Sequence, residues 1–191
     1  MTRNQVNRIN TIQAIKDSFM ELYQVHGIDK VRVADICARA KVSKSNFYNY
    51  FDDKYEMLES IENEMLQGVK EINTALKDAA WNTYKKGDPF PVYSDTAKYI
   101  WENRKYFKPL LGPNGDPSFV FRWKKQMKKD IRNKLVIDNR TNYNLDIVSE
   151  LFTNGIVGLY IYWFYENPDI SPEELSAIAG TLLYSDLYHF K

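Results

Sequence analysis

The stretch VADICARAKVSKSNFYNYF, residues 33–51, gives the clearest indication of the fold of this chain. Its apolar residues recur at steps of three and four positions, the period of a helix with one buried face. Ser43 stands between two such groups and is a good residue for the N-terminal cap of a helix. The stretch therefore predicts two short helices joined by a tight turn, the helix-turn-helix pattern. The apolar groups are Val33, Ile36, Cys37 and Ala40, followed by Phe47, Tyr50 and Phe51.

The polar face of the second short helix is rich in hydrogen-bond donors, and positions 41–51 hold no acidic residue. An ordinary solvated helix can carry such a face, and so can a helix that meets a polyanion. In a helix-turn-helix protein this second helix enters the major groove of DNA, where base edges give specificity and phosphates give register. Ser45 and Asn46 suit base edges, whereas Lys44 and Tyr48 suit phosphates.

Charge is distributed unevenly along a chain that is almost neutral overall. The 191 residues include 26 Lys and Arg and 25 Asp and Glu. Residues 1–51 hold eight basic and four acidic residues, a net charge of +4, whereas the remainder has a net charge of −3. A basic N-terminal module on a mildly acidic body favours an anionic partner for that module.

Nearly the whole chain has helical periodicity, and no segment shows sustained alternation of a strand. We therefore expect an all-α protein of about nine helices, the first three of them short. Residues 1–52 would form a three-helix head and residues 53–191 a larger helical body. Caps are expected at Asp52 or Asp53, at Asp116 and at Ser171. The helices are expected over 12–26, 33–40, 44–51, 53–76, 95–106, 117–135, 142–166 and from 172 onward, with a linker at 85–93.

The stretch from Ile12 to Leu58 resembles the TetR/AcrR family of one-component transcriptional regulators. An amphipathic helix ending at Gly27 precedes the pattern V-x-D-I-x-x-x-A-x-V-S-K-x-x-x-Y-x-Y-F-x-x-K-x-x-L. The later stretch GIVGLYIYWFYENPDISPEELSAIAGTLL, residues 155–183, is similar to the end of one subgroup of that family. In that subgroup the last two helices form the dimer interface.

The resemblance implies a DNA-binding surface on the head. Two positions depart from the family pattern. Arg32 stands where a capping Thr is usual, which weakens the cap of the second helix, and Lys41 stands where the turn usually has Gly. If the turn needs a positive φ there, Lys costs about 1 kcal/mol. The implied DNA-binding residues are Arg32, Lys41, Ser43, Lys44, Ser45, Asn46, Tyr48, Asn49, Tyr50 and Lys54.

The resemblance also implies a dimer and an effector pocket in the body. Gly155 and Gly158 lie on one face of a long helix and allow close approach, either across the dimer or to a helix of the same chain. The expected dimer interface is Gly155, Gly158, Leu159, Leu175, Ile178 and Leu182. The expected pocket for a small apolar or aromatic effector is Trp101, Tyr106, Phe107, Phe119, Trp123, Tyr160 and Trp163.

Other chemistry has little support in the sequence. Cys37 fits a small core residue, His26 and His189 stand apart without a ligand cluster, and no nucleophile-base pair is visible, so we expect no metal, no cofactor and no enzyme. No export signal and no membrane-spanning run is visible, so we expect a cytoplasmic protein. The run RWKKQMKKDIRNK, residues 122–134, fits a solvated helix face better than a second DNA contact.

The function that these observations predict is a ligand-responsive transcriptional regulator. We expect a homodimeric repressor that binds a palindromic operator, because one recognition helix reads too few bases for useful specificity. The alternative is a protein-binding co-regulator of the same fold whose DNA head has been repurposed. The departures at Arg32 and Lys41 keep that alternative open.

Overall fold

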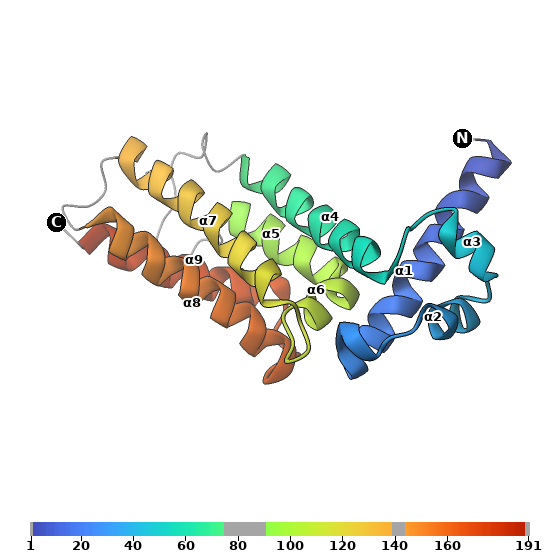
Figure 1. Cartoon of the computed structure of the whole chain (residues 1–191). Helices are drawn as coiled ribbons and strands as arrows, with labels where there is room; N and C mark the ends of the chain where they lie inside the picture. The colour runs from blue at the N-terminus through green and yellow to red at the C-terminus, as the bar shows by residue number, and fades with distance from the viewer. Residues whose placement is uncertain (1, 75–90, 139–143, 190–191) are drawn as a thin grey trace. The chain divides into compact units, whose positions relative to one another are not determined.

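A computed structural model describes residues 2–74, 91–138 and 144–189 of the chain (Figure 1). Within these residues it has nine helices and no strand, which confirms the predicted all-α fold class. The helices are α1 (Arg3–Lys30), α2 (Val33–Ala40), α3 (Lys44–Tyr48), α4 (Lys54–Thr74), α5 (Pro91–Glu102), α6 (Arg104–Leu110), α7 (Pro117–Asp138), α8 (Leu145–Tyr165) and α9 (Pro172–His189).

The chain divides into two compact units. The first consists of Met1–Met65 and Arg104–Phe119, and the second of Leu66–Asn103 and Val120–Lys191. The first unit therefore takes in α6 and the first half of α4 as well as the three leading helices. Because α4 is one continuous helix, its two halves belong to different units.

The first helix is longer than the apolar pattern predicts. It begins at Arg3 because Thr2 and Gln5 form a capping box, in which the Thr2 hydroxyl accepts from the Gln5 amide and the Gln5 side chain accepts from the Thr2 amide. Gly27 has φ +71°, as a glycine readily adopts, but its ψ of 167° is not that of the expected left-handed cap, and helical turns resume after this kink as far as Lys30. The expectation of three short leading helices is therefore wrong for α1, which has 28 residues.

Local capping signals are reproduced at three helix starts. Asp53 Oδ1 accepts from the amides of the first turn of α4, and Asp116 Oδ1 accepts from the Ser118 amide at the start of α7. Ser171 Oγ accepts from the Glu174 amide at the start of α9. These side chains satisfy amides that have no partner within the helix.

The segment expected as one helix over 95–106 is two helices. The chain breaks at Asn103, whose Nδ2 donates to the Tyr99 carbonyl at 2.9 Å, and α6 then runs to Leu110. The expected linker at 85–93 lies partly outside the described residues, and its last three residues begin α5.

The basic run of α7 pairs with α8. Three side chains spaced one turn apart on α7 each meet a polar side chain on α8, at 2.8 to 3.0 Å. Three basic side chains of this run therefore hold α7 against α8 within the second unit. The pairs are Lys124 with Asn154, Lys128 with Glu150 and Arg132 with Asp146.

Candidate functional site

The α2–turn–α3 segment has the geometry of a helix-turn-helix. Lys41 closes α2 at φ 56° and ψ 41°, so the turn does require the left-handed conformation that glycine usually supplies. The Val42 amide donates to the Cys37 carbonyl at 3.0 Å, and Ser43 Oγ accepts from the Asn46 amide at 3.1 Å. The turn and the cap together fix the direction in which α3 leaves α2.

Buried aromatic packing holds α3 against the rest of the first unit. Phe47 is completely buried, and its ring lies 5.7 Å from that of Phe51 and 5.3 Å from that of Tyr48. Tyr48 is nevertheless 55% exposed, so its hydroxyl end is accessible to a partner. Helix α3 ends at Tyr48 and continues as a turn through Asn49 and Tyr50.

Most of the residues that the sequence assigns to DNA binding have exposed side chains. The exposed ones are Arg32, Lys41, Ser43, Lys44, Ser45, Tyr48 and Asn49. The half-buried ones are Asn46, Tyr50 and Lys54. Their contact with DNA stays a prediction.

Two of these residues also have partners inside the head. Arg32 precedes α2 without a side-chain cap, as the sequence predicts, and its Nε pairs with Asp35 Oδ2 at 3.1 Å. Lys54 Nζ donates to the carbonyls of Asp29 at 3.1 Å and Val31 at 2.9 Å. Since an ammonium has three donors, Lys54 fixes the α1–α2 junction and keeps one donor for another acceptor.

Two acidic side chains of α1 are engaged with cations. Glu21 pairs with Arg39, and Asp17 accepts from Lys105 Nζ at 2.8 Å and from the Tyr106 hydroxyl at 2.6 Å. Burial acts to raise the pKa of Asp17, but its hydrogen bonds with Lys105, Tyr106 and Gln13 outweigh this and hold the pKa below its usual value.

Arg8 is a candidate that the sequence reasoning missed. Its guanidinium lies 5.8 Å from the centre of the Tyr50 ring, a cation–π distance, so the N-terminal turns of α1 lie beside the end of α3 (Figure 1). The signal was available in the Thr2–Gln5 capping box, which extends α1 far enough to bring Arg8 to this place.

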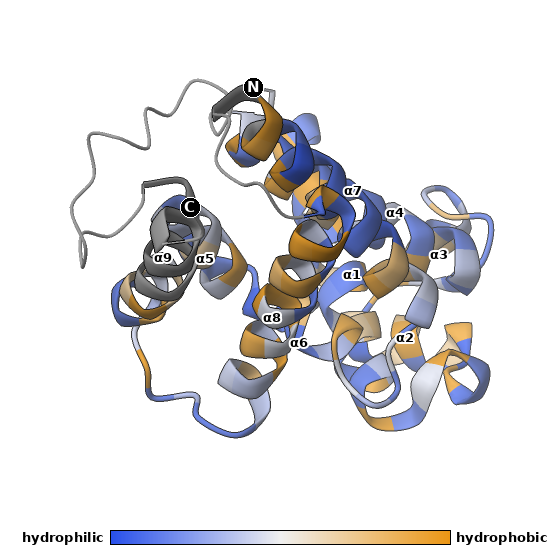
Figure 2. Cartoon of the chain, turned by 90° about the vertical axis from the view of Figure 1, so that its left-hand side faces the viewer, coloured by the Kyte–Doolittle hydropathy of each residue, from blue (hydrophilic) through white to orange (hydrophobic). Residues whose placement is uncertain are grey.

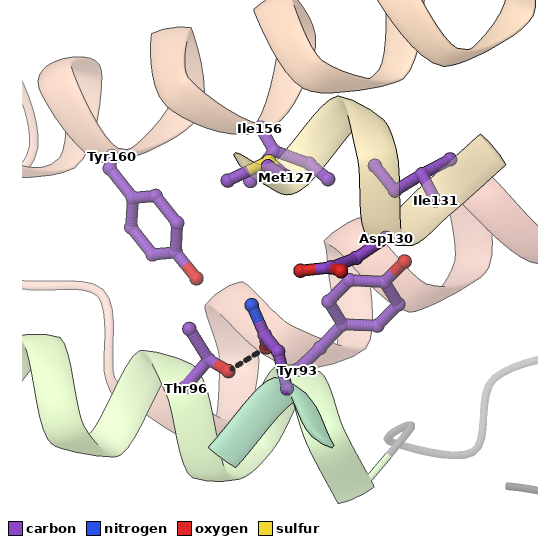
Figure 3. Close-up of a pocket in the computed structure, with 8 residues that line it drawn as sticks. Tyr93, Thr96, Met127, Asp130, Ile131, Ile156 and Tyr160 are labelled. Atoms are coloured by element: carbon purple, nitrogen blue, oxygen red, sulfur yellow. Dashed lines mark hydrogen bonds between the residues drawn. The ribbon is translucent and has the colours of Figure 1, made fainter. Parts of the chain in front are cut away.

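The second unit contains a small cavity of about 30 Å³, partly open to solvent (Figure 3). Of the seven aromatic residues expected to form an effector pocket, Tyr160 lines this cavity. The lining residues are Asn73, Tyr93, Thr96, Met127, Asp130, Ile131, Ile156 and Tyr160. A sequence signal existed for one of them, because Asp130 is the lone acid of the basic run and stands next to the apolar stripe of α7.

The other expected pocket aromatics have packing roles. Trp101 stacks on Trp163 with ring centres 4.9 Å apart, and Trp123 stacks on Tyr160 at 5.7 Å. The remaining three are buried in the first unit, where the rings of Phe107 and Phe119 lie 6.3 Å apart and Tyr106 bonds Asp17.

Helix α8 presents an exposed apolar stripe at helical spacing. Gly155 and Gly158 lie on this side, and a Cβ added at either would meet no atom within 4 Å. Leu159 is half-buried, Ile178 on α9 is 41% exposed, and the Leu182 side chain lies outside the described residues. Leu175 is 1% exposed, so it belongs to the core of the unit. The stripe consists of Ile147, Leu151, Ile161, Tyr162 and Tyr165. Figure 2 shows that much of α8 is coloured as hydrophobic.

Among the described helices, α8 is the one whose length and composition would let it cross a membrane. Its other face, however, is packed inside the unit. Trp163 is completely buried and its Nε1 donates to the Ile170 carbonyl at 2.7 Å. A core helix of this kind passes the same test of length and composition as a membrane span.

A capped turn, an exposed second helix free of acids and a separate helical body define a helix-turn-helix DNA-binding regulator. A family model described as "Bacterial regulatory proteins, tetR family" matches residues 17–61. A second TetR model, described as "Transcriptional regulator C-terminal region", matches residues 87–185, which is more than half of the chain. The chain therefore belongs to the TetR family of transcriptional regulators.

Individual relatives agree with this assignment. The uncharacterized HTH-type transcriptional regulator YxbF of Bacillus subtilis (strain 168) is 25% identical over 167 residues, which cover 85% of this chain but 42% of that protein. The structure of NalD, the secondary repressor of the MexAB-OprM multidrug efflux pump in Pseudomonas aeruginosa, is similar with a TM-score of 0.66 at 16% identity, covering 92% of this chain and 94% of NalD.

The fatty acid degradation regulator FadR from Bacillus halodurans is similar with a TM-score of 0.65 at 12% identity, covering 94% of this chain and 95% of FadR. At such low sequence identities, the similarity to these two structures shows a shared fold and no more.

Proposed function

We propose that this TetR-family regulator is a repressor that binds a palindromic operator as a two-fold dimer and leaves it when a small effector binds. The observation that carries the proposal is the surface of α3, where exposed donors surround a buried Phe47 anchor and positions 41–51 hold no acid. Residues 1–52 would be the DNA-binding head and residues 53–191 the part that binds effector and dimerises, in the cytoplasm.

The roles within the head follow from the chemistry of each side chain. Ser45 and Asn46 suit base edges near the start of α3, where a recognition helix reads DNA. Lys44 and Tyr48 suit phosphates, and Arg8 is added to them because it lies beside Tyr50. Arg32, Lys41, Ser43, Asn49 and Lys54 complete the proposed DNA-binding set.

The proposed dimer rests on the exposed stripe of α8. Leu151 is 69% exposed and Ile147 61% exposed in the single chain, and the two glycines beside them leave room for a neighbouring helix. Such a stripe pairs well with its own copy about a two-fold axis. A two-fold dimer would set two copies of α3 about one helical turn of DNA apart, on half-sites of an inverted repeat.

The proposed response to an effector rests on the cavity of the second unit, which aromatic and apolar side chains line together with the Asp130 carboxylate. NalD is a repressor and FadR a regulator of fatty acid degradation, so related folds serve such regulation. Helix α4 carries both Lys54, which fixes the α1–α2 junction, and Asn73 in the cavity wall. An effector acts by binding more tightly to the form that does not bind DNA.

Binding to a DNA fragment selected from genomic DNA tests the proposal. In fluorescence anisotropy, Tyr48→Ala should weaken binding by about 1–3 kcal/mol, and Lys44→Ala should make the salt dependence shallower by about 0.9 in log–log slope. Phe121→Ala and Lys125→Ala, at exposed positions of α7, are the matched controls and should change neither quantity. Unchanged binding in both head variants would contradict the assigned surface.

A further inference from the structure

Asp130 brings a carboxylate to the cavity of the second unit. Its two oxygens each accept from Gln126 Nε2 at 3.0 Å, and no cationic side chain among the described residues pairs with it. Figure 3 shows the carboxylate directed toward the space that the lining residues enclose. A half-buried carboxylate without a counter-ion among the described residues gains most from a ligand that brings a positive charge.

The walls around Asp130 suit the rest of an organic cation. Tyr93 and Tyr160 present aromatic rings, and burial raises the pKa of both hydroxyls above the usual value, so they stay neutral at physiological pH. Aromatic rings attract cations through their electron-rich faces. Met127 and Ile156 supply apolar wall, and Thr96 Oγ1 donates to Asn73 Oδ1 at 3.1 Å.

A second, smaller pocket shares Tyr93, Ile156 and Tyr160 with this cavity. Its other lining residues are apolar, apart from Ser176. Ser176 is 1% exposed, and its hydroxyl has no hydrogen-bond partner among the described residues. A buried hydroxyl without a partner is uncommon in proteins, and a polar group of a ligand would satisfy it.

We propose that the cavity binds a small organic amine, with its ammonium group on the Asp130 carboxylate and its apolar arm reaching along Tyr93 and Tyr160 toward Ser176. This inference rests on the proposed function, because it takes the cavity as the effector site. It goes further by assigning a positive charge to the effector. The same carboxylate repels anionic ligands, so a fatty acid or another carboxylate is a poor occupant.

Isothermal titration calorimetry of the full chain with three matched probes tests the charge preference. The probes are 2-phenylethylamine, 2-phenylethanol and phenylacetate, which share the ring and differ in charge. The amine should bind saturably and at least about tenfold more tightly than the alcohol, because a charge-assisted hydrogen bond is roughly twice as strong as a neutral one. Phenylacetate should bind most weakly.

The variant Asp130→Asn keeps the shape of the side chain and removes its charge. It should weaken amine binding about tenfold or more while leaving binding of the alcohol within about twofold. Asp95→Asn changes an exposed acid on α5 outside the cavity and should leave all three affinities unchanged. Thermal denaturation of each variant establishes that it is folded.

The proposal is overturned if the amine shows no saturable binding at millimolar concentration, if Asp130→Asn binds it as well as the unchanged protein, or if phenylacetate binds as tightly. Anisotropy on the selected DNA fragment separates this result from the proposed function. Asp130-dependent amine binding without an effect on DNA affinity supports the cation site and contradicts the effector response. Release of DNA by the alcohol or phenylacetate, without Asp130-dependent amine binding, supports the response and contradicts the cation site.

Discussion

Replacement of Lys41 by glycine should stabilise the protein and weaken its binding to DNA. Lys41 has φ 56° in the turn between α2 and α3, a conformation that costs a side-chain-bearing residue about 1–2 kcal/mol. Glycine removes this cost. It also loses more conformational entropy on folding, which lowers the stability by about 0.4–1 kcal/mol. The net gain should be about 0.5–1 kcal/mol, or about 1–4 °C in melting temperature for a chain of this size.

The assay is thermal and urea denaturation of three proteins, the unchanged chain, Lys41→Gly and Lys41→Ala. Alanine keeps the strain and removes the charge, so Lys41→Ala should be no more stable than the unchanged protein. Both variants lose the ammonium, so both should show a salt dependence of DNA binding that is shallower by about 0.9. A Lys41→Gly protein no more stable than Lys41→Ala would refute the argument from backbone conformation.

The remaining predictions concern the charge network, the exposed stripe and the helix packing. The pKa of Asp17 is lowered, so its hydrogen bonds with Lys105 and Tyr106 stabilise the fold at pH values above the ordinary carboxyl pKa of 3.8. This stabilisation is lost as pH falls below that value. Asp17→Asn should therefore flatten the fall of melting temperature between about pH 4 and pH 2. A Cβ added at Gly158 would meet no described atom within 4 Å, so Gly158→Leu should weaken dimerisation in sedimentation velocity while the protomer stays folded. An unchanged dimer would remove this position from the interface. A Cβ at Gly68 would lie 2.1 Å from the Tyr99 hydroxyl, so Gly68→Ala should lower the free energy of unfolding by about 1–3 kcal/mol in urea titrations, and a neutral effect would contradict the packing.

Local signals allowed most helix starts of this fold to be predicted. Ser43, Asp53 and Ser171 are caps whose function depends on the next two or three residues, so the sequence alone reveals them. The Thr2–Gln5 capping box is equally local. The apolar pattern, however, begins only near Ile12 and therefore predicts a later start for the first helix. The early start of α1, and with it the position of Arg8, was missed for that reason.

The cavity could not be predicted in the same way because its walls come from α4, α5, α7 and α8. Composition shows that the body is rich in aromatic residues, but it does not show which core each residue joins. Phe107 and Phe119 pack in the first unit, whereas Tyr160 faces the cavity of the second. Asp130 is polar, and the sequence pattern places it on a solvated helix face. Only the tertiary packing shows that it lies in the same cavity wall as Tyr93 and Tyr160.

Selection of genomic DNA fragments with the purified protein, at a stated salt concentration, tests the central claim most directly. The account predicts enrichment of an inverted repeat whose half-site centres lie about one helical turn apart, or a multiple of it. It also predicts that the enrichment is lost with Tyr48→Ala and kept with Phe121→Ala. A folded, dimeric protein that enriches no motif would contradict the account and favour a protein-binding co-regulator with a repurposed head.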